Sequence, residues 1–118
     1  MKDEPNLYVT NVLNLYLGLP ETPIRVSRTD RNLALDLFQR GVLTSTIEAA
    51  LLLASVRRIC RQSNAPPLGP IRSLHYFLPV IEEITHQPLP ADYLHYLRHK
   101  LTTHTLQTKA NNDAVTPG

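Results

Sequence analysis

Residues 41–61 read GVLTSTIEAALLLASVRRICR, a stretch that is apolar almost all round and carries three arginines near its end. At 100° per residue, its apolar side chains fall on two opposite faces of a helix, and only narrow polar strips remain between them. Ser45, followed by Glu48, matches a capping box and predicts where the helix begins. A helix that is apolar on two sides has to lie between other elements. The stretch therefore predicts a central core helix over about 45–61, around which the other helices pack.

Two amphipathic segments precede this stretch. Residues 7–17 and 27–40 each carry apolar side chains at helical spacing, and the first segment is followed by a glycine and a proline, which end a helix. Residues 20–27 are predicted as an extended connector, because their prolines disfavour helix in the residues before them. Gly41 stands where a C′ glycine ends the second helix, a few residues before the third begins.

The chain after residue 61 predicts two more helices. Residues 62–69 form a loop by composition, and Pro70 is placed to open the fourth helix. Pro79 interrupts that helix, so we expect a kink or two short helices that meet near Leu78. Pro90 is placed to open a fifth helix, in which leucines at helical spacing form the inner stripe.

The domain organisation follows from this order of elements. The 118 residues are enough for one domain, and 42% hydrophobic residues can fill one modest core. We predict an all-α bundle of about five helices over residues 1–104, followed by a flexible tail over 105–118. Cys60 lies in the apolar pattern and is expected to be a buried thiol. Neither a signal segment nor an apolar run of about 18 residues is present, which favours a cytoplasmic protein without a membrane span.

Positive charge is concentrated in the middle of the chain. The net charge is +2, yet residues 24–72 contain eight arginines against three acidic residues. The guanidinium group suits phosphate and carboxylate recognition, because its planar fork presents several donors. The predicted surface for DNA phosphates has seven members: Arg28, Arg31, Arg40, Arg57, Arg58, Arg61 and Arg72. The alternative is that these side chains are solvated or paired within the molecule.

The predicted second and third helices have the outline of a helix-turn-helix pair, with Gly41 in the turn. A recognition helix carries base-reading side chains such as Arg, Asn or Gln in its first two turns. The third helix presents Thr46, Glu48 and Ala49 there, together with two leucines. We therefore expect contacts with phosphates, which position a protein on DNA, rather than base reading by this helix.

The sequence contains no motif typical of an enzyme. Ser73 and His75 are two residues apart, so their side chains diverge on a helix, and no glycine-rich phosphate loop is present. His95 and His99 are spaced to share a cation, but a zinc site needs further ligands, for which no recognisable spacing exists. We interpret this pair as a solvated helix face, and we expect no metal, no cofactor and no enzymatic activity.

Three segments resemble a known kind of protein: SRTDRNLALDLFQRGVLTSTIEAALLLASVRR (27–58), APPLGPIRSLHYFLPVIEEI (65–84) and LPADYLHYLRHKL (89–101). In helix order and in these phrases they are similar to small helical replication and transposition accessory proteins of bacterial mobile elements and plasmids, and loosely to DnaD-like replication-initiation domains. This chain has Tyr93 and Tyr96 where the DnaD-like pattern has a tryptophan. The resemblance implies binding to DNA or to a protein of a replication or transposition assembly.

The sequence thus favours a non-enzymatic accessory module that binds nucleic acid through an arginine face. The alternative is a protein-interaction adaptor or a small homodimer, which would use the second apolar face of the central helix or exposed tyrosines. Binding to DNA that weakens steeply with salt favours the first function, because phosphate neutralisation releases counterions. A stable dimer without such binding favours the second.

Overall fold

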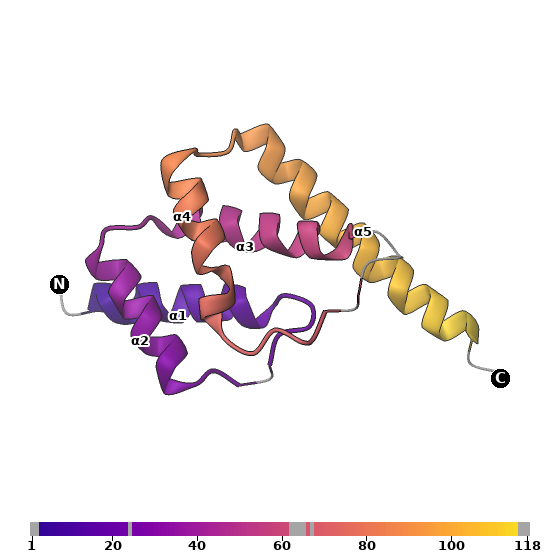
Figure 1. The fold of residues 1–118 in the computed structure, drawn as a ribbon, viewed down its shortest axis with the longest axis horizontal. Helices are drawn as coiled ribbons and strands as arrows, with labels where there is room; N and C mark the ends of the chain where they lie inside the picture. The colour runs from indigo at the N-terminus through magenta and orange to yellow at the C-terminus, as the bar shows by residue number, and fades with distance from the viewer. Residues whose placement is uncertain (1–2, 24, 62–65, 67, 116–118) are drawn as a thin grey trace.

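The computed structural model describes the backbone of residues 3–23, 25–61, 66 and 68–115, and the side chains of these residues from Glu4 to Thr103. Over these ranges every regular element is a helix (Figure 1). The elements are α1 (Asp3–Leu17), α2 (Arg28–Gln39), α3 (Thr44–Ile59), the 3-10 helix η1 (Leu74–Phe77), α4 (Leu78–His86) and α5 (Ala91–Val115). The predicted all-α fold is confirmed.

The helix α3 lies in the middle of the molecule, with α1 and α2 on one side and α4 and the first turns of α5 on the other (Figure 1). It packs against α4, α5 and α1. Ile47 and every residue from 49 to 56 are buried. The prediction of a sandwiched core helix is therefore confirmed. Cys60 follows at the C-cap of this helix and is exposed, so the prediction of a buried thiol is wrong.

The start of α2 carries a capping box that the sequence analysis did not single out. Ser27 is the N-cap: its Oγ accepts from the backbone N–H of Asp30 at 3.1 Å, and Asp30 Oδ2 accepts from the backbone N–H of Ser27 at 2.9 Å. Asp30 is 1% exposed, and its Oδ1 accepts from the backbone N–H of Leu74 at 2.9 Å. One carboxylate therefore joins the first turn of α2 to η1.

The capping box predicted at Ser45 is wrong. The helix α3 begins at Thr44, and its N-cap is Leu43, which makes no side-chain capping bond. The physical reason is the way in which α2 ends. Gly41 adopts φ +77°, and the backbone N–H groups of Gly41 and Val42 bond back to the last turn of α2 in a Schellman motif. The chain enters α3 after one further residue, which leaves Ser45 inside the first turn.

The interrupted fourth helix is confirmed as two short elements. The 3-10 helix and α4 meet at Leu78, and Pro79 lies in the first turn of α4, where its missing N–H costs nothing. The predicted start at Pro70 is wrong, because residues 70–73 are not helical and η1 begins at Leu74. The backbone N–H of Ile71 donates to the carbonyl of Glu21 at 3.0 Å, which holds this segment against the connector that follows α1.

The helix α5 projects beyond the rest of the molecule (Figure 1). Leu97 is fully buried and anchors its first half to the core. The helix continues to Val115, so most of residues 105–118 are helical where the sequence favours an irregular tail. The division into a domain over 1–104 and a flexible tail stays a prediction. Among the helices of the described residues, none is long and apolar enough to cross a membrane.

Candidate nucleic-acid interface

Arg57, in the last turn of α3, is held by an acidic partner on α4. Its Nη1 and Nη2 donate to the two carboxylate oxygens of Glu83 at 2.9 and 2.7 Å, which is the bidentate arrangement that arginine favours. These hydrogen bonds raise the pKa of Arg57 above its ordinary value and hold the pKa of Glu83 below its usual range. A phosphate at Arg57 would have to compete with this carboxylate.

Arg58 is a structural residue rather than a surface cation. Its side chain is 5% exposed, and its Nε donates to Glu21 Oε2 at 2.5 Å. The remaining donors bond to the Gly69 carbonyl and, at 3.3 Å, to the Tyr76 hydroxyl, while the guanidinium lies 5.5 Å from the centre of the Tyr76 ring. Burial lowers the pKa of Arg58, but the bonds to Glu21 and Tyr76 outweigh it and the pKa is raised. Arg58 therefore fastens three segments to α3.

Two further arginines of the predicted surface also have partners within the molecule. Arg61 donates from Nη1 to the carbonyl of Pro66 at 2.8 Å. Arg40 forms an exposed ion pair with Asp36, one turn earlier on α2, at 2.8 Å. A shallow cavity of about 270 Å³ lies at the end of α3 and is lined by Ala54, Arg57, Arg58, Arg61, Leu68, Tyr76 and Val80. The structure thus gathers three predicted arginines there, but two of them already bind carboxylates.

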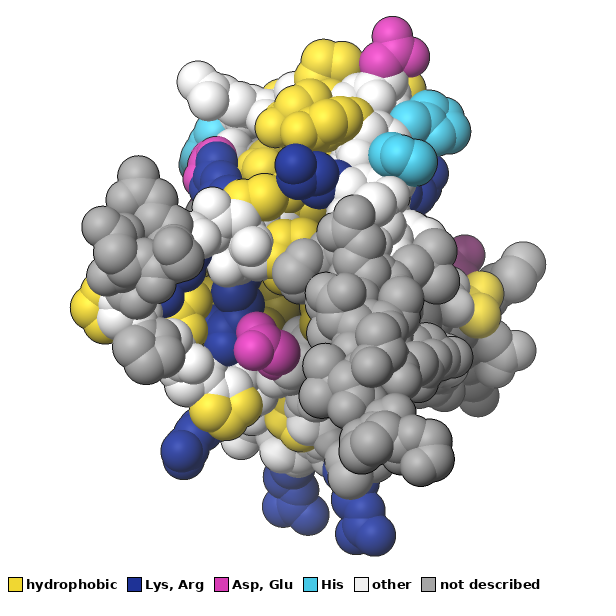
Figure 2. Space-filling view, turned by 90° about the vertical axis from the view of Figure 1, so that its right-hand side faces the viewer, with side chains coloured by type: hydrophobic (Ala, Val, Ile, Leu, Met, Phe, Trp, Pro, Cys, Tyr) yellow, Lys and Arg dark blue, Asp and Glu magenta, His cyan; other side chains and the backbone are white. Residues whose placement is uncertain are grey.

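A second set of arginines lies at the start of α2, and we call it the α2-start group: Arg25, Arg28, Arg31 and Arg72. All four are exposed, and none has an acidic partner among the residues that the structure describes. Arg28 and Arg31 are one turn apart on α2, and the bond from Leu74 to Asp30 brings the segment of Arg72 to the same place. Figure 2 shows Lys and Arg side chains projecting from the lower edge of the molecule, the edge at which Figure 1 places the start of α2.

The α2-start group lies at the N-terminal end of α2. The N-terminal end of a helix carries partial positive charge, so cations in the first turn are repelled by it. Asp30 is the acidic residue of that turn and offsets part of this repulsion, but both its oxygens accept from backbone N–H groups and neither is bonded to an arginine. A bound anion would relieve this repulsion. The surface predicted from the sequence included Arg28, Arg31 and Arg72 but not Arg25. Arg25 could have been found from its position three residues before Arg28 in the same basic segment.

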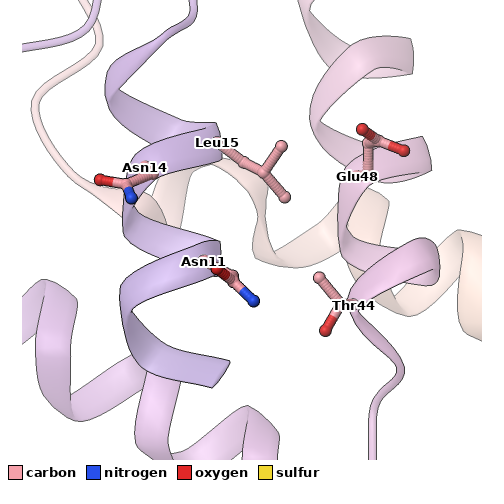
Figure 3. A pocket seen from close by; sticks show the side chains of 5 residues that line it. All are labelled: Asn11, Asn14, Leu15, Thr44 and Glu48. Carbon is pink, nitrogen blue, oxygen red and sulfur yellow. The ribbon is translucent and has the colours of Figure 1, made fainter. Parts of the chain in front are cut away.

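A separate hollow lies between α1 and α3 and contains none of the predicted arginines (Figure 3). Its volume is about 400 Å³, and its lining consists of Asn11, Asn14, Leu15, Thr44 and Glu48. In Figure 3 the side chains of Asn11 and Thr44 extend into the space between the two helices. The carboxylate of Glu48 is bound by Arg98 of α5. This hollow is open, and its lining includes no cationic side chain that could bind an anion.

His95 and His99 are exposed on α5. Among the described side chains, no group of three or more His, Cys, Asp or Glu residues is close enough to hold a metal ion. Comparisons with protein-family models, with curated proteins and with solved structures found no match to this chain. The resemblance to replication and transposition accessory proteins therefore stays a prediction.

Proposed function

We propose that this chain is a non-enzymatic module that binds DNA by contacting phosphates through the α2-start group. The observation that carries the proposal is the contrast between the two sets of arginines. Arg40, Arg57 and Arg58 are neutralised by carboxylates, whereas the four arginines at the start of α2 have no such partner among the described residues. Unpaired guanidinium groups on one edge are suited to bidentate phosphate contacts that position a protein without reading sequence.

The buried body of α3 supports phosphate contacts over base reading. Its side chains from 49 to 56 are buried, so the middle of this helix has no face that could enter a major groove, and its partly exposed first turn carries no Arg, Asn or Gln. We further propose, on the resemblance alone, that the module serves a replication or transposition assembly of a mobile element.

The test is the salt dependence of binding to a short duplex, measured by fluorescence anisotropy between about 50 and 200 mM salt. Four phosphate contacts predict a slope of log K against log salt of about −3.6. The double variant Arg28→Gln and Arg31→Gln should reduce the slope to about −1.8, since two contacts remain. Arg40→Gln is the matched control, because its charge is already paired with Asp36 at the other end of α2. An equal decrease of the salt slope in the double variant and in Arg40→Gln, or no binding to the duplex at low salt, would refute the proposal.

A protein-interaction function has one observation in its favour. Leu7 and Leu43 are 62% and 67% exposed, and they lie on segments joined by a 2.6 Å hydrogen bond from the Tyr8 hydroxyl to the Val42 carbonyl. Exposed leucines on adjoining segments are typical of a contact with a protein. Analytical ultracentrifugation tests this function: a dimer that dissociates in Leu43→Glu, combined with absent DNA binding, would favour the adaptor over the DNA-binding module.

A further inference from the structure

Two tyrosines of α5 form an exposed stack. The ring centres of Tyr93 and Tyr96 are 5.6 Å apart and the ring planes are inclined by 30°. Their exposed fractions are 40% and 51%, and neither ring belongs to the apolar cluster that Leu94 and Leu97 of the same helix join. Core packing therefore does not account for these rings. They form an ordered aromatic surface that is open to solvent on one side.

The exposed charges of α5 differ in sign on the two sides of the rings, with Asp92 on the N-terminal side and Lys100 on the C-terminal side. Lys100 follows Tyr96 by one helical turn, is exposed, and has no acidic partner in the described part of the chain. Asp92 precedes Tyr96 by one turn, and Arg57 lies near Tyr93 but is bound to Glu83. The uncompensated positive charge is thus on the C-terminal side of the rings.

The two rings and the α2-start group are both exposed, and they lie on different elements of the fold. Figure 2 shows an apolar cluster at the top with Lys and Arg side chains directly below it, and further cations along the lower edge. The start of α5 and the start of α2 lie at opposite edges of the fold in Figure 1, along the direction in which the molecule measures 30 Å. A flexible strand can cross this distance and contact both.

We propose that Tyr93 and Tyr96 form a stacking platform for the bases of single-stranded nucleic acid, with the backbone phosphates directed towards Lys100. The inference rests on the proposed function and specifies its ligand. A base can add to the outer face of a ring pair that is already stacked, and every base has a face suited to this. Bases within a duplex are stacked on one another and cannot do so without being unpaired. The platform therefore distinguishes single strands from duplexes.

The test compares three ligands of equal phosphate number: a thymidine oligomer of about 12 nucleotides, which is within the site sizes of single-strand binders, its abasic counterpart, and a duplex. We expect the thymidine oligomer to bind about 5-fold or more tightly than the abasic one, since stacking on one aromatic ring has at least this effect. Tyr96→Leu should abolish the difference and leave abasic binding unchanged. Tyr96→Phe should retain the difference, and His95→Leu on another face of α5 is the matched control.

Tyrosine fluorescence provides a second readout. The chain has five tyrosines and no tryptophan, so tyrosine emission reports directly on stacking. The thymidine oligomer should quench this emission in the parent protein and much less in the double variant Tyr93→Leu and Tyr96→Leu. These rings lie outside the core, so the variants are expected to fold. Helical circular dichroism checks this.

The outcomes separate the two proposals. Equal affinity for the thymidine and abasic oligomers, with a steep salt dependence, would overturn the platform and leave the arginine contacts standing. Absence of binding to every ligand at low salt would overturn both. A change of sedimentation state in Tyr96→Leu, without any change in oligomer affinity, would show that the rings serve a protein contact and would refute the platform.

Discussion

Replacing Asp30 by alanine should destabilise the fold more than any change of an exposed residue. The side chain accepts two hydrogen bonds, from the backbone N–H of Ser27 and of Leu74, both at 2.9 Å. Each bond from an N–H to a charged acceptor contributes about 1.5–3 kcal/mol. Because the Leu74 N–H is buried, it would be left without a partner. The two losses together predict a decrease of about 3–6 kcal/mol in the free energy of unfolding.

The other half of the capping box provides a comparison that leaves the tertiary bond in place. Ser27→Ala removes the capping bond to the Asp30 N–H but leaves the bond between Asp30 and Leu74, so it should cost about 1 kcal/mol. Asp30→Asn keeps one acceptor oxygen and turns an amide donor towards the other N–H, which predicts a loss between those of the other two variants. Urea unfolding followed by far-ultraviolet circular dichroism measures all three. Equal losses in Asp30→Ala and Ser27→Ala would refute the link to η1.

Three smaller predictions concern the turn and the buried tyrosines. Gly41→Ala should cost about 1–2 kcal/mol in urea unfolding from the positive φ alone, since a Cβ there meets no atom within 4 Å; no loss would mean that the turn can relax. Tyr16 is fully buried, and its hydroxyl has no hydrogen-bond partner among the described groups. Tyr16→Phe should therefore leave the melting temperature unchanged or raise it. Burial raises the pKa of Tyr8 and of Tyr16 to about 12. The unfolded chain loses these protons first, so stability should fall as the pH rises from about 10 to 12, and urea unfolding of Tyr16→Phe across this range should show a shallower fall.

The sequence predicted the order of helices well because the apolar spacing is strong. The central helix has two apolar faces, and no arrangement leaves both in water. Pro79 and Gly41 also acted as expected, since each restricts the backbone through its own covalent structure. Features of this kind depend on neighbouring residues and can be inferred from a single chain. Of the two boundaries that failed, the one at Pro70 lies next to a contact from elsewhere in the fold, the bond from Ile71 to Glu21, whereas the one at Ser45 is set by the Schellman motif that ends α2.

The candidate site was harder to predict because charge pairing is tertiary. Arg57 and Glu83 are 26 residues apart, and Arg58 and Glu21 are 37 residues apart. No local pattern shows that these arginines have partners while those at the start of α2 do not. The seven predicted arginines were therefore a correct list of cations but not one surface. Carboxylates pair Arg40, Arg57 and Arg58, and Arg61 is bonded to the Pro66 carbonyl. Arg28, Arg31 and Arg72 remain, and Arg25 joins them in the α2-start group.

The enclosed position of Arg58 affects how any mutational survey of this chain should be interpreted. A survey that replaces each arginine and scores retention of DNA would record a severe defect at Arg58. The defect would arise because the connector at Glu21 and the segment at Gly69 lose their bonds to Arg58. The segment that carries Arg72, which is bonded to the same connector, would then no longer be held beside the start of α2. Arg58 would then look like a residue that contacts DNA, although it affects binding only by holding other residues in place. Thermal unfolding of each variant, measured beside its affinity, distinguishes the two roles.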